Sequence, residues 1–341
     1  MGVGLEGKRV NFAGEMAPRL THSDKIPVSM RKAILLYNPA SGRRRCVADV
    51  ETALSIFRSA GVEASMAPTR AAGDSAAQVK QAISEGCDTV LACGGDGTIH
   101  DIAQALVGTD VALGILPLGT ANCLAHDLGL PLSPNGAARC ALTAKRRRIA
   151  VGHIRYQNVH QIQGSRYFIF VVGIGADAHL FYKLNPLAKR VLGMGAYYAK
   201  ATRLWLTHPM NHFVAEVSNG SQARRDEVSQ LLAVRIREFG GVLRALAPGA
   251  GLDRDDLRLV LFHTRSRFAY LRYIIRGYFR ASWQVPGIEL TDGTSAVCRL
   301  LQEGAGTQPI FVEADGELLG TLPAEIILVP DALTILVPGK P

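Results

Sequence analysis

Short apolar runs alternate with amphipathic helical patterns through the first half of the chain. The runs have the length of buried strands and stop at Gly, Asn or Pro, at residues 33–37, 62–67, 89–93 and 112–116. Apolar residues at helical spacing predict helices between them, over 47–60, 75–84 and 99–106. This alternation is typical of a doubly wound parallel sheet, which binds ligands beyond the carboxyl ends of its strands. We therefore expect an α/β domain over residues 31–150.

After the basic run Lys145–Arg148 the pattern changes to short or alternating strand-like runs. They fall at residues 149–154, 167–172, 213–217, 230–236, 257–263, 287–290, 310–314, 324–329 and 333–337. Strands at this spacing, joined by Gly and Asn turns, predict an antiparallel β-sandwich over residues 151–322. Two helical patterns interrupt it, near 187–206 and 265–282.

The composition is that of a globular protein. Hydrophobic residues make up 48% of the 341 residues and charged residues 20%, which excludes a disordered chain and agrees with two domains. Residues 1–30 have neither periodicity, and we expect them to form a disordered extension. No run approaches the roughly 18 apolar residues of a membrane span, and the start lacks the apolar core of a signal peptide. We expect a cytoplasmic protein that is soluble or lies on a membrane surface.

The charge balance narrows the class of partner. Lys and Arg number 38 and Asp and Glu 29, so the net charge is +9. Such an excess favours nucleotides, nucleic acid or an acidic membrane face. The six cysteines form no C-x-x-C pair, which argues against a zinc site and agrees with reduced thiols in the cytosol.

A glycine-rich loop, Gly94-Gly95-Asp96-Gly97-Thr98, joins a predicted strand to a predicted helix. Glycines let the backbone approach a phosphate, and a helix start offers free N–H groups and the positive end of a dipole. Asp96 is a candidate Mg²⁺ ligand, directly or through water, and Thr98 a candidate phosphate donor or helix cap. The plain alternative is a structural turn without a ligand.

Small polar residues follow two other strands of the same sheet. The candidate nucleotide ligands among them are Asn38, Ser41, Gly119, Thr120 and Asn122. Two alternatives stay open: Asn122 as a simple helix N-cap, and Arg43–Arg45 as a solvated basic patch.

Three motifs in order resemble the diacylglycerol kinase catalytic-domain family, which includes bacterial lipid kinases and the sphingosine and ceramide kinases. They are Asn-Pro-x-Ser-Gly at 38–42, Gly-Gly-Asp-Gly-Thr at 94–98 and Leu-Pro-x-Gly-Thr-x-Asn at 116–122. The likeness continues at 172–178, 195–198 and 314–317, so it covers almost everything from residue 31 onward. NAD kinases and phosphofructokinases share the Gly-Gly-Asp-Gly loop but not the segment at 116–122. The resemblance implies transfer of the γ-phosphate of Mg-ATP to a lipid hydroxyl, with diacylglycerol or a related glycerolipid or long-chain base as acceptor.

The same resemblance implies roles for individual residues. Asp315, in Asp315-Gly316-Glu317, would face the γ-phosphate and accept the proton of the lipid hydroxyl, with Glu317 as helper. Asp-Gly at this place is otherwise an ordinary hairpin turn. Thr69 would contact the nucleotide, and Asp177 would either bind the lipid headgroup or cap a helix. The resemblance also implies an ATP site in the cleft and a last segment, about 323–341, that returns to the first domain.

One departure from the family concerns a second metal. Relatives carry Leu-Asp where this chain has Leu257-Arg258, and that Asp helps to hold a structural Mg²⁺. Arg cannot ligate a metal, which argues against a second site here, and Asp255 or Asp256 is a weak substitute.

The segment 265–283 combines arginines with aromatic residues. Basic side chains attract anionic lipid, and amphipathic aromatics settle at the headgroup level, so the segment is a candidate membrane contact. The stretch 189–205 repeats the pattern less strongly. The alternative is an ordinary helix that covers the sandwich, and both can hold together. The expected partner is thus a lipid substrate at an anionic membrane, and a homodimer stays open.

Three other functions compete with a lipid kinase. An NAD kinase-like or other small-molecule kinase would act on a soluble acceptor and ignore vesicles. A nucleic-acid-binding regulator would need a basic reader module, and the sequence contains none that we recognise, so we expect no nucleic acid. A nucleotide-binding module without activity is disfavoured because the motifs at 94–98 and 315–317 are intact.

Overall fold

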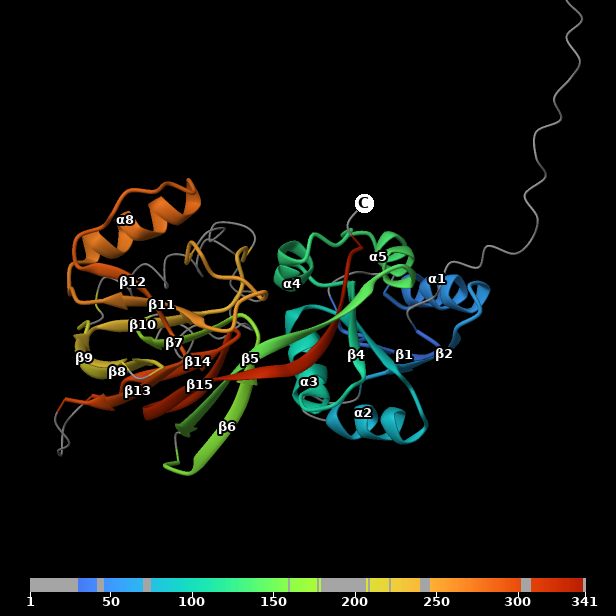
Figure 1. The fold of residues 1–341 in the computed structure, drawn as a ribbon, viewed down its shortest axis with the longest axis horizontal. Helices are drawn as coiled ribbons and strands as arrows, with labels where there is room; N and C mark the ends of the chain where they lie inside the picture. Colours follow the sequence, from blue (N-terminus) through green and yellow to red (C-terminus); the bar gives the residue numbers. More distant parts are fainter. Residues whose placement is uncertain are drawn as a thin grey trace, which may run out of the picture.

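The protein consists of two lobes joined by long strands (Figure 1). The computed structural model describes residues 30–41, 46–69, 75–158, 160–176, 178, 207, 209–220, 222–239, 246–301 and 308–339. The expected extension at 1–30, apart from Met30, and the expected helix at 187–206 lie outside these residues. No helix of the described part is long and apolar enough to cross a membrane.

The first lobe is built on a parallel sheet, as the strand–helix alternation predicted. Its first strands are β1 (Lys32–Tyr37), β2 (Glu63–Pro68), β3 (Thr89–Gly94) and β4 (Ala112–Pro117). They lie in the order β2-β1-β3-β4, and each pair is parallel. β3 and β4 are buried along their whole length, because helices cover both faces of the sheet.

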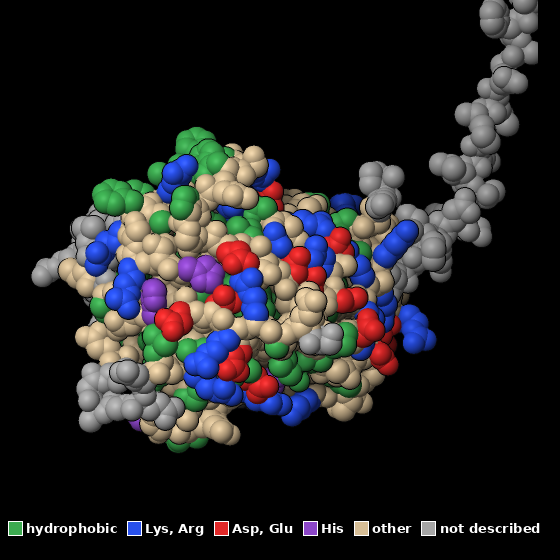
Figure 2. Space-filling view, turned by 60° about the vertical axis from the view of Figure 1, so that its left-hand side comes forward, with side chains coloured by type: hydrophobic (Ala, Val, Ile, Leu, Met, Phe, Trp, Pro, Cys, Tyr) green, Lys and Arg blue, Asp and Glu red, His purple; other side chains and the backbone are tan. Residues whose placement is uncertain are grey.

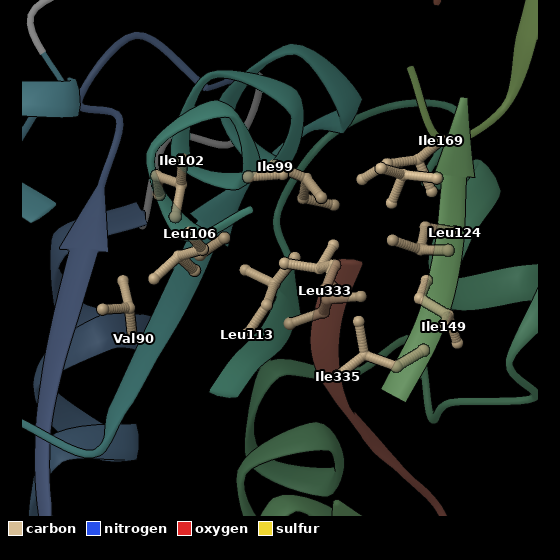
Figure 3. Close-up of a cluster of buried hydrophobic side chains, with 14 of the residues drawn as sticks. Val90, Ile99, Ile102, Leu106, Leu113, Leu124, Ile149, Ile169, Leu333 and Ile335 are labelled. Atoms are coloured by element: carbon tan, nitrogen blue, oxygen red, sulfur yellow. The ribbon is translucent and has the colours of Figure 1, made fainter. Parts of the chain in front are cut away.

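Helices pack on each face of this sheet through alternate side chains of the strands. The helices are α1 (Cys46–Ser59), α2 (Ser75–Ser84), α3 (Asp96–Leu106), α4 (Cys123–Asp127) and α5 (Pro134–Leu142). Leu35 packs with α1 and α5 on one face, whereas Leu36 packs with α2 and α3 on the other. Figure 3 shows the buried cluster on the Leu36 face, in which Ile99 and Leu106 of α3 pack with Val90 and Leu113 of the sheet.

Two long strands run through both lobes. β5 (Lys145–Gln157) and β15 (Glu317–Val337) pair in antiparallel fashion along most of their length. The end of β15 lies beside β4 in parallel, where Ile335 pairs with Leu113. The two runs expected at 324–329 and 333–337 are therefore one strand, interrupted by an irregularity between Val329 and Leu333.

The second lobe is a β-sandwich. One sheet has the order β12-β11-β10-β7-β14, the other contains β9, β8, β13, β15, β5 and β6, and the pairing of β14 with β15 joins the two. The strands not yet defined are β6 (Gln163–Phe168), β7 (Val171–Gly175), β8 (Phe213–Asn219), β9 (Gln222–Val228), β10 (Gln230–Val234), β11 (Leu257–Phe262), β12 (Ile288–Gly293), β13 (Ser295–Leu300) and β14 (Phe311–Ala314). An apolar core between the sheets includes Phe168, Phe213 and Leu259. The helix α8 (Arg267–Tyr278) covers the outer face of the first sheet.

The strand expected at 167–172 was wrong in one respect. β6 ends at Phe168 and β7 begins at Val171, with a bend at Ile169 and Phe170. The backbone N–H groups of Ile169, Phe170 and Val171 all donate to the carboxylate of Asp315. Three successive N–H groups of a regular strand do not converge on one point, so this carboxylate breaks the strand.

Candidate active site

Four loops of the first lobe meet at the carboxyl edge of the parallel strands. Cα pairing places Tyr37 beside both Pro68 and Cys93, and Gly94 beside Pro117. The predicted nucleotide ligands follow these positions directly: Asn38 and Ser41 after β1, Thr69 after β2, Gly94 to Thr98 after β3, and Gly119 to Asn122 after β4. The topology therefore brings all of these residues to one edge of the sheet.

The loops after β3 and β4 touch backbone to backbone. A Cβ on Gly119 would lie 2.4 Å from Gly95 Cα, and a Cβ on Gly94 would lie 2.5 Å from Thr98 Oγ1. Neither distance is possible for a real side chain, so both positions need glycine for close approach. Gly97 has nothing within 4 Å of a built Cβ, and Thr120 is exposed, so this part of the edge is open.

Two asparagine side chains at this edge of the sheet bond the backbone of the loops to which they belong. Asn122 has a left-handed backbone, and its amide bonds both Gly119 N, at 2.9 Å, and Gly119 O, at 3.0 Å. It is buried and occupies the N-cap position of α4, as the N-cap interpretation expected, but its side chain bonds Gly119 and makes no cap bond. Asn38 Oδ1 accepts from Ala40 N at 2.9 Å. Both side chains shape the loops that would surround a nucleotide.

Helix α3 presents a ridge of three polar residues to the second lobe. Asp96, His100 and Gln104 are spaced by four residues and so lie on one side of the helix. Gln104 bonds the backbone of Tyr167 on β6 in both directions, donating to its O at 2.9 Å and accepting from its N at 3.0 Å. This ridge fixes the glycine-rich loop against the sandwich.

Asp315 lies at the turn between β14 and β15 and reaches this ridge. His100 Nδ1 is 2.6 Å from Asp315 Oδ2, and both side chains are almost fully buried. Oδ2 also accepts from Ile169 N, and Oδ1 accepts from the N–H groups of Phe170 and Val171, each at 2.9 Å. The carboxylate therefore has four donors. Since a carboxylate offers about four lone-pair sites, it is fully occupied in this conformation.

Arg166 completes the polar network between the lobes. Its Nε donates to His100 Nε2 at 2.6 Å, which leaves the Nδ1 proton of a neutral imidazole for Asp315. Its Nη1 lies 2.8 Å from Glu317 Oε2 and its Nη2 lies 3.4 Å from Asp101 Oδ1. Glu317 thus contacts the site through Arg166 and is half exposed, whereas Asp315 is buried.

Asp96 carries the chemistry that a metal ion would need. Burial raises the pKa of its carboxyl, while N–H donors from Leu124 and Cys123 offset part of the rise and the charge of Asp315 adds to it. Its Oδ1 is buried and has no hydrogen-bond partner among the described residues. A buried carboxylate oxygen without a hydrogen-bond partner fits a divalent cation.

The cation would depend on the nucleotide for most of its ligands. The described residues contain no group of three or more His, Cys, Asp or Glu able to hold a metal. Mg²⁺ commonly takes one or two carboxylates and fills its other positions with phosphate oxygens and water. Asp96 is the residue that would hold it here.

The side chains of the site that escaped the sequence analysis include His100, Gln104, Cys123 and Arg166. His100 had a usable signal, because it stands one helical turn after Asp96 on the same side of α3. Cys123 Sγ lies 3.0 Å from Phe239 O, and burial raises the pKa of this thiol to about 12. Arg166 had no signal, since its partners come from distant parts of the chain.

Other predicted features lie elsewhere. Asp177 and the basic run Arg43–Arg45 are outside the described residues. Arg258 bonds Asp292 at 2.7 Å and Pro248 O at 2.9 Å, so a guanidinium group stands where relatives were expected to have a metal ligand. Asp256 is likewise paired, with Arg254.

Comparison with known proteins covers both lobes. Residues 32–154 match the family model of the diacylglycerol kinase catalytic domain, and residues 170–337 match that of the YegS C-terminal NAD kinase beta sandwich-like domain. The chain is 26% identical over 315 residues to a diacylglycerol kinase of Bacillus subtilis, covering 91% of this chain and 98% of that one. It is 28% identical over 309 residues to a diacylglycerol kinase of Mycobacterium tuberculosis, covering 90% and 95%.

A partial sequence match and a solved structure agree with these similarities. A probable YegS-like lipid kinase of Chromohalobacter salexigens is 36% identical over 161 residues, 46% of this chain and 49% of that one. The crystal structure of a putative diacylglycerol kinase from Bacillus anthracis superposes with a TM-score of 0.72 at 20% identity, covering 94% of this chain and 98% of that one. This last likeness supports the fold, an α/β domain followed by a sandwich.

Proposed function

Because this chain belongs to the diacylglycerol kinase catalytic-domain family, we propose that it is a lipid kinase that transfers the γ-phosphate of ATP to a lipid hydroxyl, with Mg²⁺ as cofactor. Diacylglycerol is the first candidate acceptor, since relatives that match along nearly their whole length bear that name. Related glycerolipids and long-chain bases are the other candidates.

The observation that carries the proposal is that helix α3, which begins at Asp96, contacts Asp315 of the other lobe through His100, whose Nδ1 lies 2.6 Å from Asp315 Oδ2. Asp96 follows the last strand residue of β3 by two positions, and Asp315 lies in the turn between β14 and β15. They are close enough that the charge of Asp315 raises the pKa of Asp96. Phosphoryl transfer requires a metal-bound nucleotide on one side and an acceptor hydroxyl with a proton acceptor on the other.

The first lobe would bind the nucleotide. The open stretch at Gly97 and the exposed Thr120 would face the phosphates, and the free N–H groups at the start of α3 would donate to them. Asp96 would hold Mg²⁺, which when bound neutralises charge on the phosphate oxygens. Asn38, Ser41, Thr69 and Asn122 would order the surrounding loops.

Asp315 would receive the proton of the acceptor hydroxyl. Its carboxylate is already held by four donors, so accepting a proton requires one donor to withdraw. Three of these donors are main-chain groups, and His100 is the side chain that can move. Glu317 would assist by holding Arg166, which in turn positions His100. The acceptor itself would be reached at an anionic membrane that the enzyme visits as a peripheral protein.

The decisive experiment is transfer of radiolabelled γ-phosphate to a panel of lipids in mixed micelles. Wild type should label one lipid class and should need Mg²⁺. Asp96→Asn and Asp315→Asn should each reduce transfer by about 10²–10⁴-fold. Label on a soluble acceptor such as NAD, with none on any lipid, would assign a small-molecule kinase instead.

A matched control separates chemistry from folding. Asp110 is fully exposed, so Asp110→Asn is the control carboxylate, and circular dichroism should show the same fold in all variants. Full transfer by a folded Asp315→Asn would remove that residue as the proton acceptor.

A further inference from the structure

The outer face of α8 and the residues after it carry most of the large hydrophobic side chains that are exposed among the described residues. We propose that this face is the docking surface for an anionic lipid bilayer, an inference that rests on the proposed lipid kinase function. The proposal concerns α8 and the residues that follow it to Trp283. These are called the α8 surface below.

One side of α8 is committed to the sandwich. Tyr270 and Tyr273 are buried and pack against Phe262 of β11, with ring centroids 4.5 and 5.2 Å away. Arg276 is also buried, and its guanidinium lies 4.3 Å from the centre of the Tyr273 ring. This inner side packs α8 onto the sandwich.

The opposite side is apolar although it faces outward. Eleven large hydrophobic side chains are exposed among the described residues, and seven of them belong to the α8 surface: Phe268, Leu271, Ile274, Ile275, Tyr278, Phe279 and Trp283. Phe268 is 85% exposed and Phe279 67%. Figure 2 shows hydrophobic side chains gathered at the top of the molecule, where Figure 1 places α8. Positions 268, 271, 275 and 278 have helical spacing, so they form one continuous stripe.

Such a stripe is costly in water and indicates a partner. Contiguous exposed apolar residues usually mark an interaction site, whereas scattered ones do not. Phenylalanine, tyrosine and tryptophan at the rim of a helix are suited to the boundary between headgroups and acyl chains.

Charge decides which partner fits. The segment from Arg265 to Trp283 contains five arginines and no acidic residue. Arg265, Arg272 and Arg280 are exposed around the apolar stripe. A second copy of the chain packed on the same face would bring like charges together, whereas an anionic bilayer supplies the opposite charge. The combination is that of an interfacial amphipathic helix.

The position of the α8 surface also suits access to the candidate site. Arg280, just after α8, forms an ion pair with Glu238. Glu238 N donates to Asp127 Oδ1 at 3.1 Å, and the neighbouring Phe239 O lies 3.0 Å from Cys123 Sγ. The segment 237–239 therefore contacts both the end of α8 and α4, beside Asp96. A bilayer on the α8 surface would lie on the same side of the molecule as the loop after β4, as Figure 1 shows for α4 and α8.

Vesicle flotation with the full chain tests the proposal without any catalytic readout. Wild type should float with vesicles of phosphatidylcholine and phosphatidylglycerol, should float less with phosphatidylcholine alone, and should be released by high salt. Phe268→Ser should weaken binding at least about tenfold, because a phenyl ring leaves the bilayer. Arg272→Gln should weaken it about fivefold, and only with anionic vesicles.

Two matched controls lie on other surfaces. Ile162 is 62% exposed in the turn between β5 and β6, so Ile162→Ser removes an exposed apolar side chain from another surface. Arg225 is exposed on β9, so Arg225→Gln removes the same charge as Arg272→Gln from another surface. Both should float like wild type. Equal losses in these controls would overturn the assignment to α8.

The kinase assay in micelles separates this proposal from the proposed function. A wild-type chain that labels lipid in micelles but fails to float would overturn the docking surface and keep the kinase. A wild-type chain that binds vesicles in an α8-dependent way but labels no lipid would keep the docking surface and overturn the kinase function. Dimerisation abolished by Phe268→Ser, seen by analytical ultracentrifugation in the absence of vesicles, would show that a second copy covers the face.

Discussion

His100 Nδ1 lies 2.6 Å from Asp315 Oδ2, and this contact joins α3 of the first lobe to the β14–β15 turn of the second. The imidazole is held from its other side by Arg166 and Gln104, both of which approach Nε2. A neutral histidine therefore joins three main-chain N–H groups in ordering the carboxylate that we assign as proton acceptor.

Two replacements of His100 should show how much its hydrogen bond to Asp315 contributes to the free energy of unfolding. His100→Ala leaves a buried carboxylate oxygen without one donor, so we expect a loss of about 1–3 kcal/mol in the free energy of unfolding. His100→Asn places an amide N–H near the Nδ1 position and should recover part of this loss. Urea titration of the two variants and wild type measures the difference. Equal stability of the Ala and Asn variants would contradict a role for the Nδ1 bond.

Asp96 should limit stability in a pH-dependent way. Burial raises the pKa of its carboxyl, so the folded state binds a proton more readily than the unfolded state does. Stability from this group is then present at low pH and is lost as the pH rises through the raised pKa. At pH 7 the free energy of unfolding of Asp96→Asn should accordingly exceed that of wild type by about 0.5–2 kcal/mol, although the variant loses transfer activity.

The gain from Asp96→Asn should shrink as the pH is lowered toward about 3, below the ordinary Asp pKa of about 3.9, where the wild-type carboxyl is mostly neutral in both states. Urea titrations at several pH values measure it. Asp110→Asn, at an exposed position, is the control and should show no such trend. A gain that is constant with pH would sink the explanation from burial.

Gly119 should be intolerant of any side chain. In Gly119→Ala the new Cβ would lie 2.4 Å from Gly95 Cα and 2.9 Å from Asn122 Oδ1, so the two loops must separate. We expect a loss of about 1–3 kcal/mol. Gly97→Ala is the matched variant, since it meets nothing within 4 Å and adds a better helix former inside α3. Thermal unfolding of both should show a lower midpoint for the first and an unchanged or higher one for the second.

Arg235 should be essential to the second lobe. Its side chain is buried and donates to three carbonyl oxygens, those of Arg254, Asp256 and Ala150, at 2.6–2.9 Å. Arg235→Ala would leave these acceptors buried without donors, and we expect a loss of at least about 3 kcal/mol. Arg155→Ala removes an exposed arginine paired with Glu325 and should cost less than about 1 kcal/mol. Similar losses in guanidinium titrations would refute the distinction.

Much of the first lobe could be predicted, because its strands are short, apolar and end at glycine or proline. The loops at the sheet edge followed from the same pattern, since parallel strands bring their carboxyl ends together. The second lobe was harder. β9 reads Gln-Ala-Arg-Arg-Asp-Glu-Val and escaped notice because it is a polar edge strand, defined by its pairing with β8.

The contacts within the site could not be derived from local patterns. The bend at Ile169 and Phe170 depends on a carboxylate about 145 positions later in the chain. Asn122 carries a common helix-cap residue type, yet its left-handed backbone turns the amide back to Gly119. At Ile169 and Phe170 a tertiary hydrogen bond overrides the local expectation, whereas at Asn122 a bond to a residue three positions earlier replaces the usual cap.

The parallel pairing of β15 with β4 has a consequence for how the protein is made. Leu333 and Ile335 belong to the apolar core of the first lobe, although the ribosome produces them more than 200 residues after Leu113, their neighbour in that core. Until they emerge, a nascent chain would carry an open edge at β4 and an unfilled core beneath α3. The first lobe is first in sequence but cannot be the first to finish folding, so a chain cut short during translation would lack a complete first lobe.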